Sequence, residues 1–110
     1  MLPRQHRLTL APEFTATVRG GKRTSGRAVV SYRRATSPEL PARFGFIVSK
    51  AVGPAVQRNL VKRRLRAVSA ESIKAGLGGA DVVVRALPAA ATTPYAALRE
   101  ELLSQLGVRA

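Results

Sequence analysis

Four cations and one amide, crowded into nine positions, are the side chains best suited to chemistry in this sequence. They recur at intervals of three and four residues, so on a helix they share one side. Like charges at this spacing destabilise an isolated helix by roughly 0.2–0.5 kcal/mol per pair, which an external anion would offset. Arginine binds phosphate oxygens in pairs, lysine supplies a point charge, and an amide both donates and accepts hydrogen bonds. The predicted phosphate-binding residues are Arg58, Asn59, Lys62, Arg63 and Arg66.

A solvated charged face is the alternative interpretation of these residues. Such faces usually mix acids with bases, whereas positions 43–74 hold eight Lys and Arg and one acid, Glu71. The 110-residue chain carries a net charge of +13, from 19 Lys and Arg against 6 Asp and Glu, and residues 1–80 hold the whole surplus. A compact protein keeps such a surplus mainly when a polyanion neutralises it, so we expect a nucleic acid partner.

Two aromatic residues are candidates for stacking on unpaired bases, which contributes about 1–3 kcal/mol per base. For Phe14, on the buried face of a short predicted helix, core packing is an equal alternative. Tyr32 fits a wet cleft better, because its hydroxyl favours contact with water. Phe44 and Phe46 alternate along a predicted strand, and we expect them in the core.

Little in the sequence supports catalysis by the protein itself. Cysteine is absent, and the six acids are too scattered to predict a metal nuclease site. The single histidine, His6, has no evident acidic partner, so we interpret it as a surface residue or a phosphate contact. The longest uncharged stretch, residues 86–98, is too short to cross a membrane, and no secretory signal is visible. We therefore expect a cytoplasmic protein without a small-molecule substrate.

The periodicity predicts one domain over residues 1–110, of mixed α+β class with the element order α-β-β-α-β-α. A short helix begins at Pro12 and ends at Gly20-Gly21, and strands cover 26–34 and 43–49. We expect these two strands to pair as an antiparallel hairpin. A long helix covers 55–75, with Val61, Leu65, Val68 and Ser72 facing the sheet.

The carboxyl-terminal third of the chain is predicted to add one strand and one helix. Residues 81–87 contain Val82, Val83 and Val84, a β-branched run typical of a buried strand. The last helix follows, with Thr93 as its cap, Pro94 as its first residue and Gly107 after its end. The same apolar spacing places Tyr95, Leu98, Leu102 and Leu106 on its buried face.

Residues 43–66 resemble the signature of the bacterial ribonuclease P protein family. The opening Arg7-Leu8, the pair Glu13-Phe14 and a strand that bears Tyr32 are similar to that family too, so the resemblance covers essentially the whole chain. The most specific part is a fixed spacing over fifteen positions: Val52, Gly53, Ala55, Val56, Arg58, Asn59, Lys62, Arg63 and Arg66.

The resemblance implies an α-β-β-β-α sandwich-like fold, like the second domain of ribosomal protein S5, with a left-handed β-α-β crossover. It implies an accessory subunit of the endoribonuclease that removes the 5′ leader of precursor tRNA, with the chemistry carried by a catalytic RNA and Mg²⁺ held mainly by that RNA. The implied partners are this RNA and precursor tRNA. The implied RNA-docking residues are the four cations and one amide named above, and the implied leader-cleft residues are Phe14, Tyr32, Val48 and Lys50.

Three positions depart from the family pattern. Leu60 stands where arginine is usual, Val18 where an aromatic is common, and Ala51 where a basic residue is frequent. Rival interpretations are a ribosomal or other structural RNA-binding protein without a role in cleavage, a nuclease acting alone, and a DNA-binding module. The spacing around Arg58 and Asn59 discriminates against the structural RNA-binding protein, and the DNA-binding module is disfavoured because no helix-turn-helix pair is visible.

Overall fold

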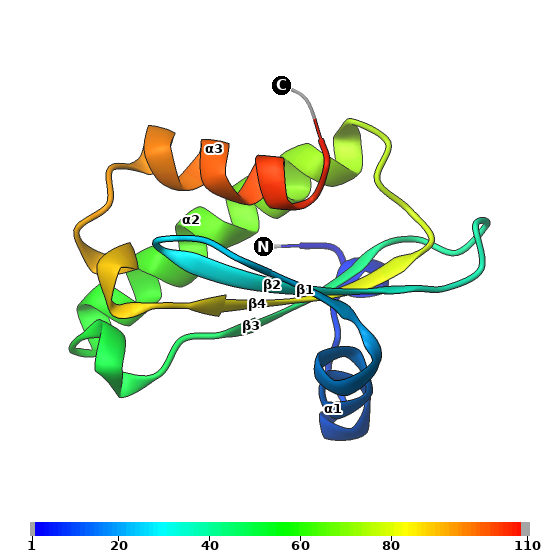
Figure 1. Cartoon of the computed structure of the whole chain (residues 1–110), viewed down its shortest axis with the longest axis horizontal. Helices are drawn as coiled ribbons and strands as arrows, with labels where there is room; N and C mark the ends of the chain where they lie inside the picture. The colour runs from blue at the N-terminus through cyan, green and yellow to red at the C-terminus, as the bar shows by residue number, and fades with distance from the viewer. Residues whose placement is uncertain (1, 109–110) are drawn as a thin grey trace.

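A four-stranded sheet lies between helices in this computed structural model, which describes residues 2–108 (Figure 1). The helices are α1 (Ala11–Gly20), α2 (Ala55–Lys74) and α3 (Tyr95–Gln105). The strands are β1 (Lys22–Ser25), β2 (Val29–Ala35), β3 (Arg43–Ile47) and β4 (Ala80–Ala86). Short 3₁₀ turns are η1 (Arg4–His6), η2 (Lys50–Val52) and η3 (Pro88–Ala91). This mixed α+β fold confirms the predicted class, but β1 was not predicted, so the predicted order α-β-β-α-β-α lacks one strand.

The order of the strands in the sheet is β1-β2-β4-β3, which shows that the predicted hairpin was wrong. The two strands expected to pair are β2 and β3, yet β4 lies between them, antiparallel to β2 and parallel to β3. The physical reason lies in the run Val82, Val83 and Val84, each 0% exposed. A strand that is apolar on both faces is most stable at the centre of a covered sheet.

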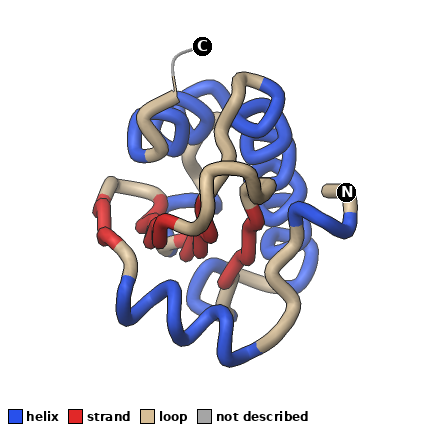
Figure 2. Tube along the Cα trace, turned by 90° about the vertical axis from the view of Figure 1, so that its right-hand side faces the viewer, coloured by secondary structure: helices blue, strands red, loops and turns tan. Residues whose placement is uncertain are grey.

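The crossover from β3 through α2 to β4 is left-handed. Both strands run in the same direction, and α2 covers one face of the sheet (Figures 1 and 2). Viewed from the α2 side with these strands pointing away, β4 lies to the left of β3. This confirms the topology that the resemblance implied, against the strong general preference for right-handed connections.

Two apolar cores lie on opposite faces of the sheet. The larger core, under α2 and α3, contains Phe44, Leu65 and Leu98, each nearly or fully buried. The predicted sheet-facing residues of α2, which are Val61, Leu65, Val68 and Ser72, are all buried, as expected. The smaller core, on the face covered by α1, contains Leu8, Val30, Tyr32 and Val83, with Phe14 and Val18 packed against it.

The start of α3 differs in detail from the sequence prediction. Its helical residues begin at Tyr95 after Pro94, and Thr93 makes no capping bond. The Thr93 hydroxyl donates instead to the carbonyl of Ala89, at 2.7 Å, and so closes the η3 turn. Tyr95 is 39% exposed, so it lies outside the buried face of α3.

Asp81 at the start of β4 ties the α1 side of the molecule to the sheet. Its carboxylate accepts hydrogen bonds from Arg43 at 2.9 Å and from Arg34 at 3.2 Å, and Arg43 also pairs with Glu13 of α1 at 2.7 Å. Burial acts to raise the pKa of Asp81, but the hydrogen bonds from Arg43 and Arg34 outweigh it and the pKa is lowered. The carboxylate is therefore ionised at neutral pH, and it holds β2, β3 and β4 in register.

Candidate RNA-binding surface

Helix α2 presents its predicted phosphate-binding residues on the side next to its buried face. Asn59 and Arg63 are exposed, and Arg58, Lys62 and Arg66 are partly buried along the neighbouring row. Gly53, at a φ of 149° that favours glycine, turns the chain from η2 into α2, and its carbonyl accepts a hydrogen bond from Nε of Arg58 at 3.2 Å. The structure therefore brings all five residues onto one surface.

These cations have no acidic partner within the fold. Among residues 2–108, the ion pairs join Arg34, Arg43 and Arg99 to Asp81, Glu13 and Glu71, and none involves the phosphate-binding residues of α2. Arg64 lies one helical turn after Leu60, which stands where the family pattern usually has arginine. Its guanidinium donates a hydrogen bond to the carbonyl of Thr93 at 3.4 Å and so lies toward the α3 side. The α2 row is therefore available to an external polyanion.

The α1 face of the sheet brings together the two predicted stacking residues. The ring of Phe14 lies so close to Gly45 of β3 that a Cβ at this position would overlap it. Tyr32 belongs to the same apolar cluster but is only 8% exposed, so it is less open to water than we expected. Val48 packs on the opposite face, against the α2 core, and Lys50 is exposed in η2. Of the four expected cleft residues, the structure thus places Phe14 and Tyr32 on one sheet face.

Two cations on the same face were missed by the sequence analysis. Arg23 of β1 is paired in register with Tyr32, and Arg85 of β4 is paired with Val30. Residues paired across strands share a face of the sheet, so Arg23 and Arg85 lie on the α1 face and are exposed there. The alternation of Val83 with Arg85 was the available signal for Arg85, whereas the polar strand β1 gave no signal for Arg23.

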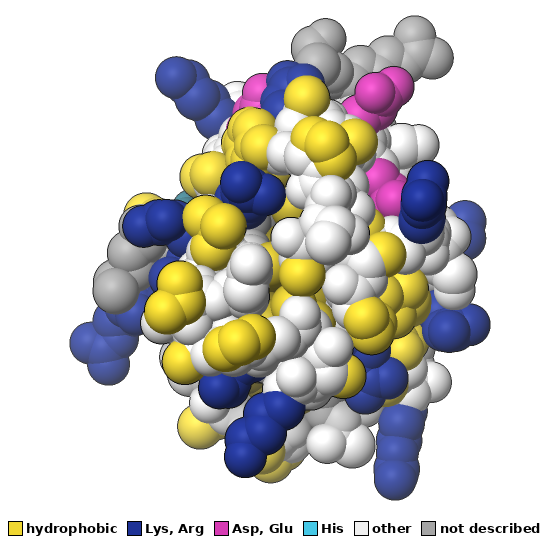
Figure 3. Space-filling view, turned by 90° about the vertical axis from the view of Figure 1, so that its left-hand side faces the viewer, with side chains coloured by type: hydrophobic (Ala, Val, Ile, Leu, Met, Phe, Trp, Pro, Cys, Tyr) yellow, Lys and Arg dark blue, Asp and Glu magenta, His cyan; other side chains and the backbone are white. Residues whose placement is uncertain are grey.

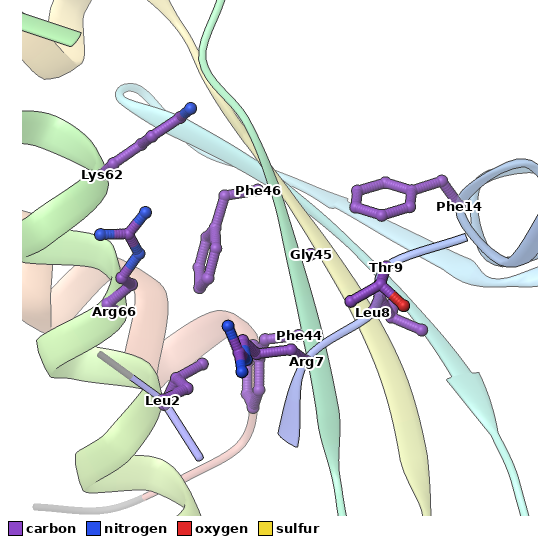
Figure 4. A pocket seen from close by; sticks show the side chains of 10 residues that line it. All are labelled: Leu2, Arg7, Leu8, Thr9, Phe14, Phe44, Gly45, Phe46, Lys62 and Arg66. Carbon is purple, nitrogen blue, oxygen red and sulfur yellow. The ribbon is translucent and has the colours of Figure 1, made fainter. Parts of the chain in front are cut away.

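A pocket of about 200 Å³ lies at the outer edge of β3, between that strand, the amino-terminal segment and α2 (Figure 4). Its walls combine cations with aromatic rings, and none of its lining residues is acidic. The lining residues are Leu2, Arg7, Leu8, Thr9, Phe14, Phe44, Gly45, Phe46, Lys62 and Arg66.

The described acids and His6 do not gather at one place in the fold. No cluster of three or more His, Cys, Asp or Glu that could hold a metal ion occurs in residues 2–108. Nδ1 of His6 lies 2.7 Å from the carbonyl of Ala42, so His6 fastens η1 to the chain before β3 and is not a free surface residue. Within the same residues, no helix is long and apolar enough to span a membrane.

The end of the molecule that holds η2, η3 and the first turns of α2 and α3 is strongly basic. Lys and Arg side chains surround this face, and acidic side chains are confined to its upper part (Figure 3).

A sequence model of the ribonuclease P family matches residues 2–108. The chain belongs to the ribonuclease P protein family. The protein is therefore a component of ribonuclease P, the tRNA-processing ribonuclease, as the resemblance implied.

Similar ribonuclease P proteins cover nearly the whole chain. The ribonuclease P protein component of Kocuria rhizophila is 51% identical over 105 residues, which are 94% of this chain and 91% of that protein. The component from Pseudarthrobacter chlorophenolicus is 50% identical and covers 92% of this chain and 74% of its own length. The solved ribonuclease P protein of Thermotoga maritima is 25% identical, with a TM-score of 0.81 over 94% of this chain and 98% of that one.

The solved ribonuclease P protein of Staphylococcus aureus gives the same result, with 26% identity and a TM-score of 0.80 over 93% of each chain. The ribonuclease P fold thus persists although about three quarters of the residues differ. The three departures, at positions 18, 51 and 60, leave the fold intact: Val18 packs in the smaller core, Ala51 is exposed, and Leu60 is partly buried.

Proposed function

We propose that this chain positions RNA for ribonuclease P by neutralising phosphates that would otherwise repel each other. Helix α2 docks on the catalytic RNA through Arg58, Asn59, Lys62, Arg63 and Arg66. The bond-breaking chemistry belongs to that RNA and to the Mg²⁺ that it mainly holds, and the protein supplies no nucleophile. The cytoplasm is the expected location of the assembled enzyme.

The observation that carries this proposal is that the phosphate-binding cations of α2 make no ion pair with a described acid. Four Lys and Arg side chains share one helix side without a carboxylate partner among the described residues, which costs stability in the free protein. An RNA backbone offsets that cost, because each phosphate pairs with a cation and releases condensed counterions.

The α1 face is the proposed site for the single-stranded 5′ leader of precursor tRNA. Phe14 supplies a partly buried ring, Tyr32 belongs to the same cluster, and Arg23 and Arg85 provide cations on the same sheet face. Rings that stack on bases together with cations that track phosphates are the usual means of binding single strands. Lys50, exposed in η2 after the end of β3, borders this site, whereas Val48 packs on the opposite face of the sheet and is left out of it.

Cleavage of precursor tRNA at low magnesium tests the proposal directly. The catalytic RNA mixed with this protein is expected to produce mature 5′ ends at magnesium concentrations where the RNA alone is inactive. The protein alone, freed of RNA, is expected to cleave nothing. An RNA-packing role without a part in cleavage predicts binding with no gain in activity, and a specific 5′ cut by the protein alone would contradict the division of labour.

A further inference from the structure

The pocket at the β3 edge connects the two surfaces that the proposed function treats separately. Figure 4 shows Phe14 on one side of β3, and Lys62 and Arg66 reaching in from α2 on the other. Gly45 lets the ring of Phe14 lie directly against β3, because the Cβ of a larger residue would displace that ring. A strand of RNA that passes from the α1 face to α2 around the β3 edge crosses this pocket.

Phe46 supplies a flat apolar surface inside the pocket. Its side chain is partly buried, and its ring lies nearly parallel to that of Phe44, with centroids 6.3 Å apart and planes 11° apart. Phe44 is 1% exposed and therefore holds its neighbour in place. Figure 4 shows Phe46 between β3 and the two α2 cations. A ring fixed in this way is a suitable platform for one nucleic acid base.

The main chain of β3 offers hydrogen bonds beside this ring. Leu8 donates its N–H to the carbonyl of Phe44 at 2.9 Å, so Phe44 turns its main-chain groups away from β4. Residues of a strand alternate in this respect, so Phe46 also turns its N–H and carbonyl outward. In residues 2–108, the bridge between Arg7 and Phe44 is the last pairing on this edge, and no strand covers it at Phe46.

Lys62 and Arg66 supply charge at the opposite wall. They are one turn apart on α2, and neither makes an ion pair with an acid of the described chain. Two cations above an aromatic platform match the phosphate and the base of a single nucleotide, whereas a double helix would hide the face of the base.

We infer that this pocket binds one unpaired nucleotide, whose base stacks on Phe46 and bonds to the β3 main chain while its phosphate contacts Lys62 and Arg66. The inference rests on the proposed function and names a subsite that connects its two surfaces. The nucleotide belongs either to the leader of precursor tRNA or to an unpaired segment of the catalytic RNA, and the chemistry of recognition is the same.

The first test uses the isotope-labelled full chain and a short single-stranded oligouridylate. Main-chain amide signals of Gly45 and Phe46 are expected to shift during the titration, together with side-chain signals of Lys62. A duplex of the same length serves as the control and is expected to leave Phe46 unchanged. Shifts confined to the α1 face, with none at Phe46, would overturn the subsite while leaving the leader site intact.

The second test replaces the ring in the assembled enzyme with Phe46→Leu, which keeps an apolar side chain against the core. Loss of one stacked base is worth about 1–3 kcal/mol, or about a 5- to 150-fold loss of affinity. If the leader supplies the nucleotide, the affinity of the holoenzyme for precursor tRNA falls while its affinity for mature tRNA does not. If the catalytic RNA supplies it, binding of the protein to that RNA weakens instead.

Tyr95→Leu is the matched control, because it removes an exposed ring outside the pocket and is expected to change neither affinity. Thermal unfolding of both variants checks that they fold. A folded Phe46→Leu protein with wild-type affinity in both assays would overturn the subsite. Failure of the wild-type protein to bind the catalytic RNA would instead refute the proposed function.

Discussion

Most acids of this chain are used inside the fold. Glu13, Glu71 and Asp81 pair with arginines, and Glu101 accepts hydrogen bonds from three main-chain N–H groups. Within the described part of the chain, the phosphate-binding cations of α2 are left without acidic partners. At this scale the sequence was informative, because the spacing of Arg58, Asn59 and Lys62 fixes their common side on any helix. It was less informative for Val48, whose face depends on the alternation with Phe44 and Phe46 and on where β3 lies in the sheet.

Lys62→Ala tests a single phosphate contact. The slope of log binding constant against log salt for the catalytic RNA is expected to become shallower by about 0.7–0.9, the value for one lost phosphate contact. Lys74→Ala is the control on the same helix, since Lys74 is exposed in the last turn, away from the phosphate-binding row. Binding measured over a series of salt concentrations gives both slopes, and equal slopes for Lys62→Ala and wild type would remove Lys62 from the interface.

The elements were predicted better than their arrangement. Periodicity located both long helices and three strands, because each buries an apolar stripe or a β-branched run. It could not locate β1, which consists of Lys22, Arg23, Thr24 and Ser25 and is stabilised by its pairing with β2 rather than by apolar burial. The position of β4 between β2 and β3 is a long-range property, although the double burial of Val82–Val84 was a signal for a central strand.

Glu101 joins helix α3 to the sheet. Its carboxylate accepts hydrogen bonds from the N–H groups of Ala28 at 2.9 Å and Val29 at 2.8 Å, where β2 begins. Glu101→Ala leaves these donors unsatisfied, and we expect it to reduce the free energy of unfolding by about 1.5–3 kcal/mol. Denaturant unfolding measures this change.

The neighbouring Glu100→Ala is the matched control for that experiment. Glu100 is exposed and makes no hydrogen bond to another described residue, so its loss is expected to change stability by less than about 0.5 kcal/mol. Equal stability of the two variants would show that Glu101 does not anchor α3.

The ion pairs around Asp81 join α1 and three strands, and so contribute to the stability of the whole fold. Asp81 is 1% exposed, whereas Arg34 and Arg43 keep 38% and 33% of their side chains in solvent. Removing one partner of a fully buried pair costs about 3–5 kcal/mol, so with this partial exposure we expect Asp81→Asn to cost about 2–3 kcal/mol. Chemical unfolding at neutral pH measures the loss.

The pH dependence of unfolding tests whether ionised Asp81 stabilises the folded state. The folded protein holds the pKa of Asp81 below its ordinary value of 3.8, because hydrogen bonds from Arg43 and Arg34 outweigh the effect of burial. Its contribution to stability is therefore complete above that value and is lost as pH falls through the lower folded-state pKa. Asp81→Asn is expected to flatten the fall of stability below about pH 4, whereas Glu39→Gln, an exposed control, is expected to keep it.

The net positive charge of the whole molecule is the property that an RNA partner explains. A surplus of +13 is kept on a small fold, and among residues 2–108 the phosphate-binding cations of α2 have no acidic partner, an arrangement that a bound polyanion stabilises. Under the proposed function, the protein contributes binding and positioning, and the catalytic RNA contributes the reaction.

Cleavage of precursor tRNA by the reconstituted enzyme at low magnesium, with Arg58→Ala and Arg63→Ala combined, tests this claim most directly. Both side chains lie outside the buried face of α2, so the variant is expected to fold. The account predicts that its activity falls toward that of the RNA alone and returns when magnesium is raised. Wild-type activity of the folded double variant at low magnesium would contradict it.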